Sequence, residues 1–268
     1  MSYLEAIFLG SVQGITEFLP VSSTAHIILM ELILGQNFSG LGFEVFLHLA
    51  SVLAVIIYYF NDLLEIVKGF FGFLIKNKSK KNRVHFYFGL YLLLATLITG
   101  VLGLILEDLV SGVMKTTFFM GLALLVTGVF LVLIERFQNY GSRTEKEMSW
   151  RDSVIVGLGQ TLAVLPGISR SGATLITGLW AGLKRKTAVR YSFLLLIPVA
   201  LGSSLLSYKD LTGEFIAEIG WGPLIGAFAA SFLFSLLGII WLIDILQKKR
   251  LVYLAIYCFL LGTSLLFV

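Results

Sequence analysis

Long apolar runs alternate with short polar segments along the chain, in the lengths typical of membrane-crossing helices. A helix needs about 20 predominantly apolar residues to span the hydrocarbon core of a bilayer. We expect six full spans, at residues 42–60, 85–106, 117–136, 188–207, 221–245 and 251–268. The pattern therefore predicts an all-α, polytopic membrane protein that forms one membrane domain over residues 1–268.

Two further apolar regions are interrupted near their centres by proline. Residues 3–35 are broken at Pro20, and residues 152–183 are broken at Pro166. A proline inside a helix removes a backbone donor and clashes with the preceding turn. Irregular backbone is tolerated at membrane depth only where protein or water covers it. We therefore expect each region to form two short helices joined by a loop, a re-entrant helical hairpin.

The composition supports a membrane location. Hydrophobic residues make up 57% of the chain and charged residues 13%, against about 45–50% and about 25% in soluble domains. No Lys or Arg precedes the first apolar run, so no signal peptide is expected. The single cysteine, Cys258, lies in the last run and is expected to serve packing.

Basic residues gather in four segments, which predicts the orientation of the chain because cytoplasmic loops are rich in Lys and Arg. The segments are 68–83, 136–151, 184–190 and 248–250. Six spans place these four segments on the cytoplasmic side and leave Lys115 and Lys209 on the outer side. The first hairpin, in a stretch without Lys or Arg, is then expected to enter from outside, and the second from inside. The net charge of +4 reflects these loops and not a nucleic-acid surface.

The two hairpins also resemble each other in sequence. The stretch "GSVQGITEFLPVSS" (10–23) aligns, with one gap, to "GLGQTLAVLPGISRS" (157–171). Opposite entry and this similarity predict an inverted-topology repeat, with halves at 1–136 and 152–268. Such repeats bring broken helices together near the membrane midplane, where the binding site lies. Two unrelated proline kinks are the alternative.

Polar side chains concentrate at the tip of the first hairpin, which raises the question of what chemistry they carry. They are Gln13, Glu17, Ser22, Ser23, Thr24 and His26. Hydroxyl residues suit a helix N-cap, so a new helix is expected to begin just after Pro20. Taken alone, the hydroxyls would fit ordinary capping, and His26 would fit a buried, hydrogen-bonded imidazole.

The second tip carries Arg170 between Ser169 and Ser171, with Thr174 one turn further on. Helix N-termini bind anions, and a guanidinium matches two phosphate oxygens at once. An arginine near the bilayer centre costs about 2.5–3.5 kcal/mol on insertion scales. We therefore expect Arg170 to bind substrate, or else to form an internal ion pair with Glu17.

Both tips together predict a site for a metal-bound phosphate or pyrophosphate. Glu17 can hold Mg²⁺ or Ca²⁺, which favour carboxylates and phosphate oxygens. Ser23 can attack phosphorus with His26 as its base, His26 can attack directly, or His26 can activate water. A third element, with Glu44, His48 and Ser51 on one helical stripe, either joins the site or serves helix packing.

The motifs "QGITEFLPVSSTAH" (13–26) and "PGISRSGAT" (166–174), with "FEVFLHLASVLAV" (43–55), resemble those of the undecaprenyl-pyrophosphate phosphatases of the bacitracin-resistance type. The resemblance implies removal of the terminal phosphate of undecaprenyl pyrophosphate, which recycles this carrier lipid for cell-wall synthesis. It also implies a divalent cation and a bacterial cytoplasmic (inner) membrane protein whose site faces the periplasm or outer side.

The resemblance assigns roles to residues of both tips. The expected catalytic residues are Glu17, Ser23, His26 and Arg170. The expected substrate-binding residues are Gln13, Ser22, Thr24, Glu44, Ser169, Ser171 and Thr174. Relatives have Glu or Gln at the position of Gln13, so Glu17 is the main metal candidate here, and some have Gln at the position of His48, which leaves its role open.

A transporter or flippase of a phosphorylated polyprenyl lipid is the main alternative, because alternating access also uses inverted hairpins that meet at a polar centre. A purely structural membrane subunit would leave Glu17 and Arg170 without a purpose. The predicted partners are the polyprenyl lipid and the bilayer, with a homodimer left open.

Overall fold

The computed structural model describes residues 1–35, 42–75, 78–113, 116–137, 139, 141–207 and 213–267, and within these ranges the regular elements are helices. In chain order they are α1 (Tyr3–Phe18), α2 (Ser23–Leu34), α3 (Gly42–Tyr58), α4 (Phe60–Leu74), α5 (Lys80–Val113), α6 (Thr117–Phe137), α7 (Trp150–Thr161), the 3-10 helix η1 (Leu162–Val164), α8 (Arg170–Trp180), α9 (Arg185–Leu206), α10 (Gly213–Ile219), α11 (Trp221–Gln247) and α12 (Leu251–Leu265). The predicted all-α class is confirmed.

The number of spans differs from the six predicted. Four helices among the described residues are long and apolar enough to cross a membrane: Lys80–Leu106 within α5, and α6, α9 and α11. The predicted span at 42–60 ends at Tyr58, where α3 and α4 meet at 79°, and only the bent pair together passes as a fifth. The predicted span at 251–268 is α12, a helix of 15 residues, shorter than a full span. The lengths of the apolar runs in the sequence predicted neither the bend after Tyr58 nor the end of α12.

The two predicted hairpins are present. The chain turns between α1 and α2, and again between η1 and α8. Leu19 and Leu165, the residues before the two prolines, are extended, with ψ of 128° and 122°. A proline disfavours the helical conformation of the residue that precedes it. The proline therefore ends the first arm of each hairpin, as the sequence predicted.

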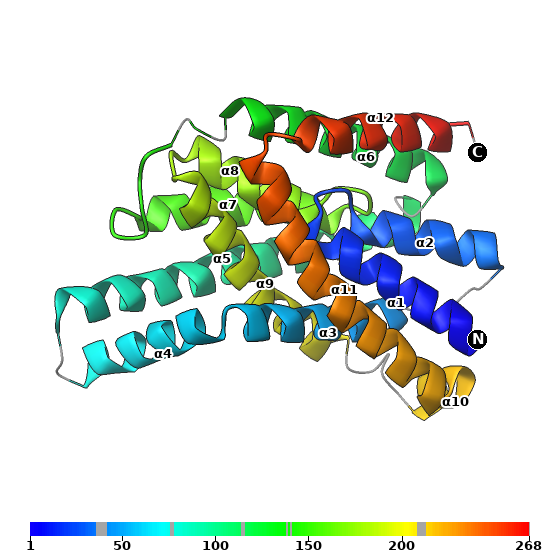
Figure 1. Ribbon diagram of the computed structural model, residues 1–268, viewed down its shortest axis with the longest axis horizontal. Helices are drawn as coiled ribbons and strands as arrows, with labels where there is room; N and C mark the ends of the chain where they lie inside the picture. Colours follow the sequence, from blue (N-terminus) through cyan, green and yellow to red (C-terminus); the bar gives the residue numbers. More distant parts are fainter. Residues whose placement is uncertain are drawn as a thin grey trace.

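Helices from the two halves pack against one another. The helix α1 lies along α11, α7 packs on α5, and α6 packs on α12 (Figure 1). Small residues allow the closest approach. A Cβ atom added at Gly10 would lie 2.2 Å from the carbonyl oxygen of Ala227, and one at Gly14 would lie 2.4 Å from that of Ser231. Glycine is therefore required where α1 meets α11.

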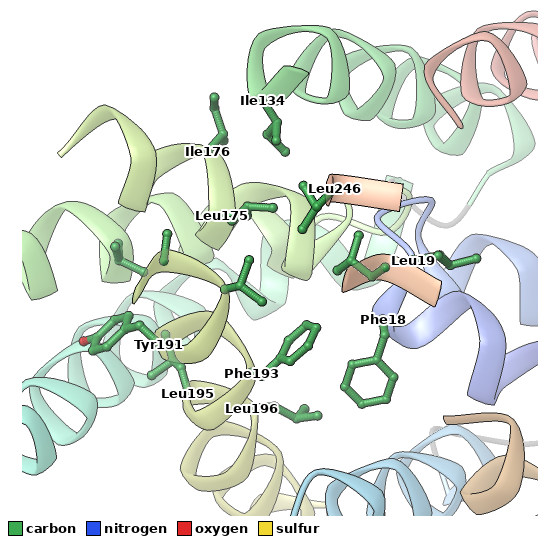
Figure 2. Packing of buried hydrophobic residues seen from close by; sticks show 14 of the residues in the cluster. Phe18, Leu19, Ile134, Leu175, Ile176, Tyr191, Phe193, Leu195, Leu196 and Leu246 are labelled. Atoms are coloured by element: carbon green, nitrogen blue, oxygen red, sulfur yellow. The ribbon is translucent and has the colours of Figure 1, made fainter. Parts of the chain in front are cut away.

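The main hydrophobic core includes residues from both hairpins. Figure 2 shows Phe18 of α1 close to Phe193 of α9, with Leu175 of α8 in the same cluster. The rings of Phe18 and Phe193 meet edge to face, with centroids 5.4 Å apart, a favoured aromatic geometry. Because Phe18 follows Glu17 in the chain, this packing fixes the last turn of α1 and the direction of the Glu17 side chain.

The two ends of the molecule differ. The start of α1 and the end of α12 lie at one end, and the turn between α4 and α5 and the loop between α6 and α7 lie at the other (Figure 1). The basic segments after α4 and α6 therefore share one end, as the predicted orientation requires. Lys115 and Lys209 lie outside the described residues.

Candidate active site

The tips of the two hairpins and the helix α3 enclose a cavity of about 200 Å³. Its polar wall includes Glu17, Ser22, Ser23, Thr24, His48, Ser169 and Arg170. Pockets that enclose drug-sized ligands hold roughly 300–1,000 Å³. The cavity is thus sized for a small polar headgroup and not for a long lipid tail.

Glu17 is the centre of the polar network. Its carboxylate oxygen Oε1 accepts a hydrogen bond from Nη2 of Arg170 at 2.7 Å. Its Oε2 accepts from Ser23 Oγ at 2.8 Å and from Gln13 Nε2 at 2.9 Å, and lies 3.2 Å from Nε2 of His48. The side chain is 2% exposed. A carboxylate buried this deeply is stable only because donors and cations surround it.

This network joins both hairpins, since Glu17 and Arg170 are 153 positions apart in the chain. The ion pair that the sequence offered as one possibility for Arg170 is present. Only one of its guanidinium nitrogens is bonded to Glu17 in the described structure, whereas a guanidinium has five N–H donors. Arg170 therefore has donors left for an anion in the cavity.

Ser23 is presented at the first position of α2. The preceding residue, Ser22, is the N-cap and has a φ of 69°, a backbone conformation that residues other than glycine rarely adopt. Its Oγ accepts from the backbone N–H of Ala25. Strained backbone of this kind clusters at functional sites. The turn directs the Ser23 hydroxyl back to the last turn of α1, where it meets Glu17.

His26 lies beside the site but not in the cavity wall. Its Nδ1 lies 2.7 Å from the carbonyl oxygen of Ser22, which can only accept, so Nδ1 is the donor. Its Nε2 lies 2.6 Å from the hydroxyl of Tyr257, and the two rings stack. Both ring nitrogens are engaged, so this geometry favours a positioning role. Catalysis by His26 stays a prediction.

His48 is the imidazole that the structure brings to the carboxylate. Its Nδ1 faces the carbonyl oxygen of Glu44 at 2.8 Å, and its Nε2 faces Glu17. Two acceptors require a donor at each ring nitrogen, which is the imidazolium form. The stripe of Glu44, His48 and Ser51 was the signal for this residue. Ser51 does not share the role of His48, however, because its Oγ accepts a hydrogen bond from Ser235 Oγ on α11 at 2.9 Å.

The remaining predicted residues of the second tip build the start of α8. Ser169 is its N-cap: its Oγ accepts from the N–H of Gly172 at 3.1 Å, and its own N–H donates to Thr127 of α6 at 3.0 Å. Ser171 Oγ lies 3.1 Å from Ser169 Oγ. Thr174 donates to the Arg170 carbonyl at 3.0 Å. Ser169 lines the cavity, whereas Ser171 and Thr174 hold the turn that carries Arg170.

The donors suit a metal only partly. Among the described residues, no group of three His, Cys, Asp or Glu side chains is placed to hold an ion. Glu17 is the single carboxylate among the described residues that line the cavity, and the buried Oε1 of Gln13, one turn earlier, has no hydrogen-bond partner within the same part of the chain. Mg²⁺ is usually held by one or two carboxylates together with substrate phosphates. The residues fit a cation shared with a phosphate ligand and not one enclosed by protein alone.

Fold and site together define a class: a multi-pass helical membrane protein with a polar cavity and a buried ion pair where two hairpin tips meet. A family model described as "Bacitracin resistance protein BacA" matches residues 6–264. The chain belongs to this bacitracin resistance protein family.

Curated relatives match over nearly their full length. The chain is 58% identical to undecaprenyl-diphosphatase 2 of Halalkalibacterium halodurans, over all of this chain and 96% of the relative. It is 54% identical to undecaprenyl-diphosphatase 1 of Shouchella clausii, over 98% of this chain and 95% of the relative. It is 39% identical to the undecaprenyl-diphosphatase of Oceanobacillus iheyensis, over 96% of this chain and 94% of the relative.

Proposed function

We propose that this chain is an undecaprenyl-diphosphate phosphatase, which hydrolyses undecaprenyl pyrophosphate to undecaprenyl phosphate and inorganic phosphate. The relatives carry that name over nearly the whole length of both chains. One observation carries the proposal in this molecule: a guanidinium, a carboxylate and a serine hydroxyl from opposed hairpins meet at one small cavity. The reaction recycles the carrier lipid for wall synthesis, and such recycling accounts for bacitracin resistance.

Arg170 and the two helix starts bind the pyrophosphate. The N-termini of α2 and α8 both open on the cavity, where backbone N–H groups and the helix dipole favour an anion. Arg170 adds a planar fork for the phosphate oxygens. These groups neutralise the charge that grows on the leaving undecaprenyl phosphate as the P–O bond breaks.

Ser23 is the proposed nucleophile. Its Oγ attacks the terminal phosphorus while Oε2 of Glu17, 2.8 Å away, takes the proton. The bond from that phosphorus to the bridging oxygen breaks, and undecaprenyl phosphate leaves. Water then attacks the phosphoserine, the bond from phosphorus to Ser23 Oγ breaks, and that oxygen takes back the proton held by Glu17. Inorganic phosphate leaves, so the two steps together consume one water.

His48 and Arg170 hold Glu17 in place for this proton transfer. Each bonds a different oxygen of the same carboxylate. The carboxylate therefore has a fixed orientation toward Ser23, and near-attack geometry of this kind lowers the barrier. His26 supports the same turn from behind, through the carbonyl of Ser22.

A divalent cation, Mg²⁺ or Ca²⁺, is part of the proposal. Glu17, with Gln13 nearby, would hold it together with oxygens of the pyrophosphate. When bound, such an ion supplies charge neutralisation for the leaving phosphate. Chelation by EDTA should then abolish turnover, and added Mg²⁺ should restore it, whereas activity that survives EDTA would remove the ion from the proposal.

The placement in the cell follows the charge distribution. We propose a bacterial inner-membrane location with the cavity reached from the periplasmic or outer side, because the first hairpin lies in a stretch free of Lys and Arg. We also propose that residues 1–136 and 152–268 are inverted repeats. The exchanged pairings α1 with α11 and α5 with α7 support this arrangement. A homodimer, and the absence of nucleic-acid binding, stay predictions.

Phosphate release by purified protein in detergent, with undecaprenyl pyrophosphate as substrate, tests the function directly. The enzyme proposal expects stoichiometric inorganic phosphate and undecaprenyl phosphate. The transporter alternative expects movement of the lipid across proteoliposomes without release of phosphate. Transport without hydrolysis would overturn the enzyme proposal.

A further inference from the structure

A second and larger cavity lies away from the hairpin tips. It has a volume of about 1210 Å³ and shares no lining residue with the first cavity. Its walls come from α4, the start of α5, the loop between α6 and α7, and the start of α9. These segments include the turn and the loop at the end of the molecule opposite the start of α1 (Figure 1). By the distribution of basic residues, this end faces the cytoplasm.

The carboxylates in this second cavity are already engaged by cations. Asp62 accepts from Nε of Arg190 at 2.8 Å, and Glu145 lies 3.7 Å from the same guanidinium. Glu65 lies 3.0 Å from Nζ of Lys81. Arg190 also stacks over the ring of Phe88, and its side chain is 15% exposed. Arg190 is therefore a fixed cation in the wall.

Five further basic side chains line the cavity without an ion-pair partner among the described residues. They are Lys80, Arg83, Lys146, Lys184 and Lys186. They come from three separate segments, so they surround the space and do not form a single charged face. Like charges that converge on one cavity repel each other, and an anion bound between them removes that repulsion.

Two helix starts add to the positive potential. The helix α5 begins at Lys80, and α9 begins at Arg185 with Lys184 as its N-cap. Neither helix has an acidic residue in its first turn, although acidic residues are the ones that stabilise this position. The preference for basic cytoplasmic loops explains the sign of these charges. That preference does not explain why three separate segments place their basic side chains around one cavity.

We propose that this second cavity binds a phosphate-bearing anion. Basic pockets between helices on the cytoplasmic side recognise the headgroups of anionic lipids, and a soluble phosphate presents the same chemistry. The helix α4, which contributes Asp62 and Glu65 to the cavity wall, also carries exposed apolar side chains, including Phe71 and Leu74, which suit a ligand with acyl chains. The proposal does not depend on the hydrolytic function.

Native mass spectrometry of the full-length protein in detergent tests it. The probe is dioleoyl phosphatidylglycerol, and dioleoyl phosphatidylcholine, a zwitterion without net charge, is the comparison. Lys184→Gln/Lys186→Gln should weaken phosphatidylglycerol binding roughly 30-fold, from the usual contribution of two basic residues near anionic lipid. Lys248→Gln/Lys249→Gln is the matched control, because it removes the same charge from another basic turn outside the cavity.

Calorimetry with inorganic phosphate, on the same variants, separates the two sources. Loss of phosphatidylglycerol binding confined to the cavity variant identifies a lipid headgroup, and loss of phosphate binding confined to it identifies a soluble ligand. If the cavity variant and the control bind both probes alike, the proposal is overturned. Lys80→Gln/Lys146→Gln serves as a second cavity variant should the first not fold. Hydrolysis in detergent should stay unchanged in each of these variants.

Discussion

The two hairpin tips have the same local architecture and carry different chemistry. In both, a proline ends the first arm and a serine caps the second, Ser22 before α2 and Ser169 before α8. In the first tip the Ser23 hydroxyl donates to the Glu17 carboxylate, and the second tip contributes Arg170. In the proposed mechanism, one scaffold used twice thus separates the groups that react from the group that binds phosphate.

The paired glutamines of the tips show the same division. Gln13 donates to Glu17 at 2.9 Å, inside the network. Gln160, its counterpart in the aligned sequences, donates to Thr99 of α5 at 3.0 Å instead. Equivalent positions therefore serve the site in one hairpin and helix packing in the other. The predictions below test this division between the tips, from the largest expected effect to the smallest.

The largest effect is expected at the nucleophile of the first tip. Ser23→Ala should lower kcat by about 10⁴-fold or more, since removal of a nucleophile disables the residues that act with it. Ser171→Ala, which removes a buried hydroxyl beside Arg170, should cost less than about 10-fold because, among the described residues, this hydroxyl bonds Ser169 alone. Initial rates of phosphate release compare them, and labelled substrate should leave phosphoserine in the wild type and in Ser171→Ala but not in Ser23→Ala. Equal, small losses would point to water as the nucleophile.

The second largest effect concerns the ion pair that joins the tips. Arg170→Ala should lower kcat about 10²–10³-fold, the usual cost of removing a group that stabilises developing charge. Arg170→Lys should recover only part of this, because an ammonium lacks the planar fork. Glu17→Ala should be at least as damaging, because it also removes the base.

A double-mutant cycle on Glu17 and Arg170 makes this prediction sharper. The two losses should be strongly non-additive, since the residues share one network. Circular dichroism and thermal unfolding check that the helices persist in each variant. Full activity in either single variant would refute the site.

Local sequence signals predicted the hairpins and most of the network. Proline acts on its own neighbours, so Pro20 and Pro166 marked both breaks, and the tip residues follow in the chain. Local signals could not show which histidine contacts Glu17, because the partner of His26 is Tyr257, 231 positions away. The bend after Tyr58 has no proline or glycine at the junction, so an apolar run gave no sign of it.

A moderate effect is expected from the contact by which α12 supports the first tip, as Thr127 of α6 supports the second. Tyr257→Phe removes the hydroxyl that meets His26 and should lower kcat about 2–10-fold with KM unchanged, the worth of one neutral hydrogen bond. Tyr253→Phe is the matched control, because Tyr253 lies one turn earlier on α12 and is 66% exposed. His26→Gln should cost a similar factor. A loss above about 10²-fold for His26→Gln would instead restore it as a general base.

The smallest effect is expected from the glutamine of the second tip. Gln160→Leu removes one hydrogen bond to Thr99 and also a buried oxygen without a partner in the described structure. Because the loss and the gain offset each other, the free energy of unfolding should change by less than about 1 kcal/mol. Turnover should be unchanged, whereas Gln13→Leu should slow it several-fold by removing one of the donors to Oε2 of Glu17. Chemical denaturation and phosphate release, measured on both variants, compare the two positions. If Gln160→Leu slowed turnover as much as Gln13→Leu, the second tip would share in the chemistry, and the division of labour between the hairpins would fail.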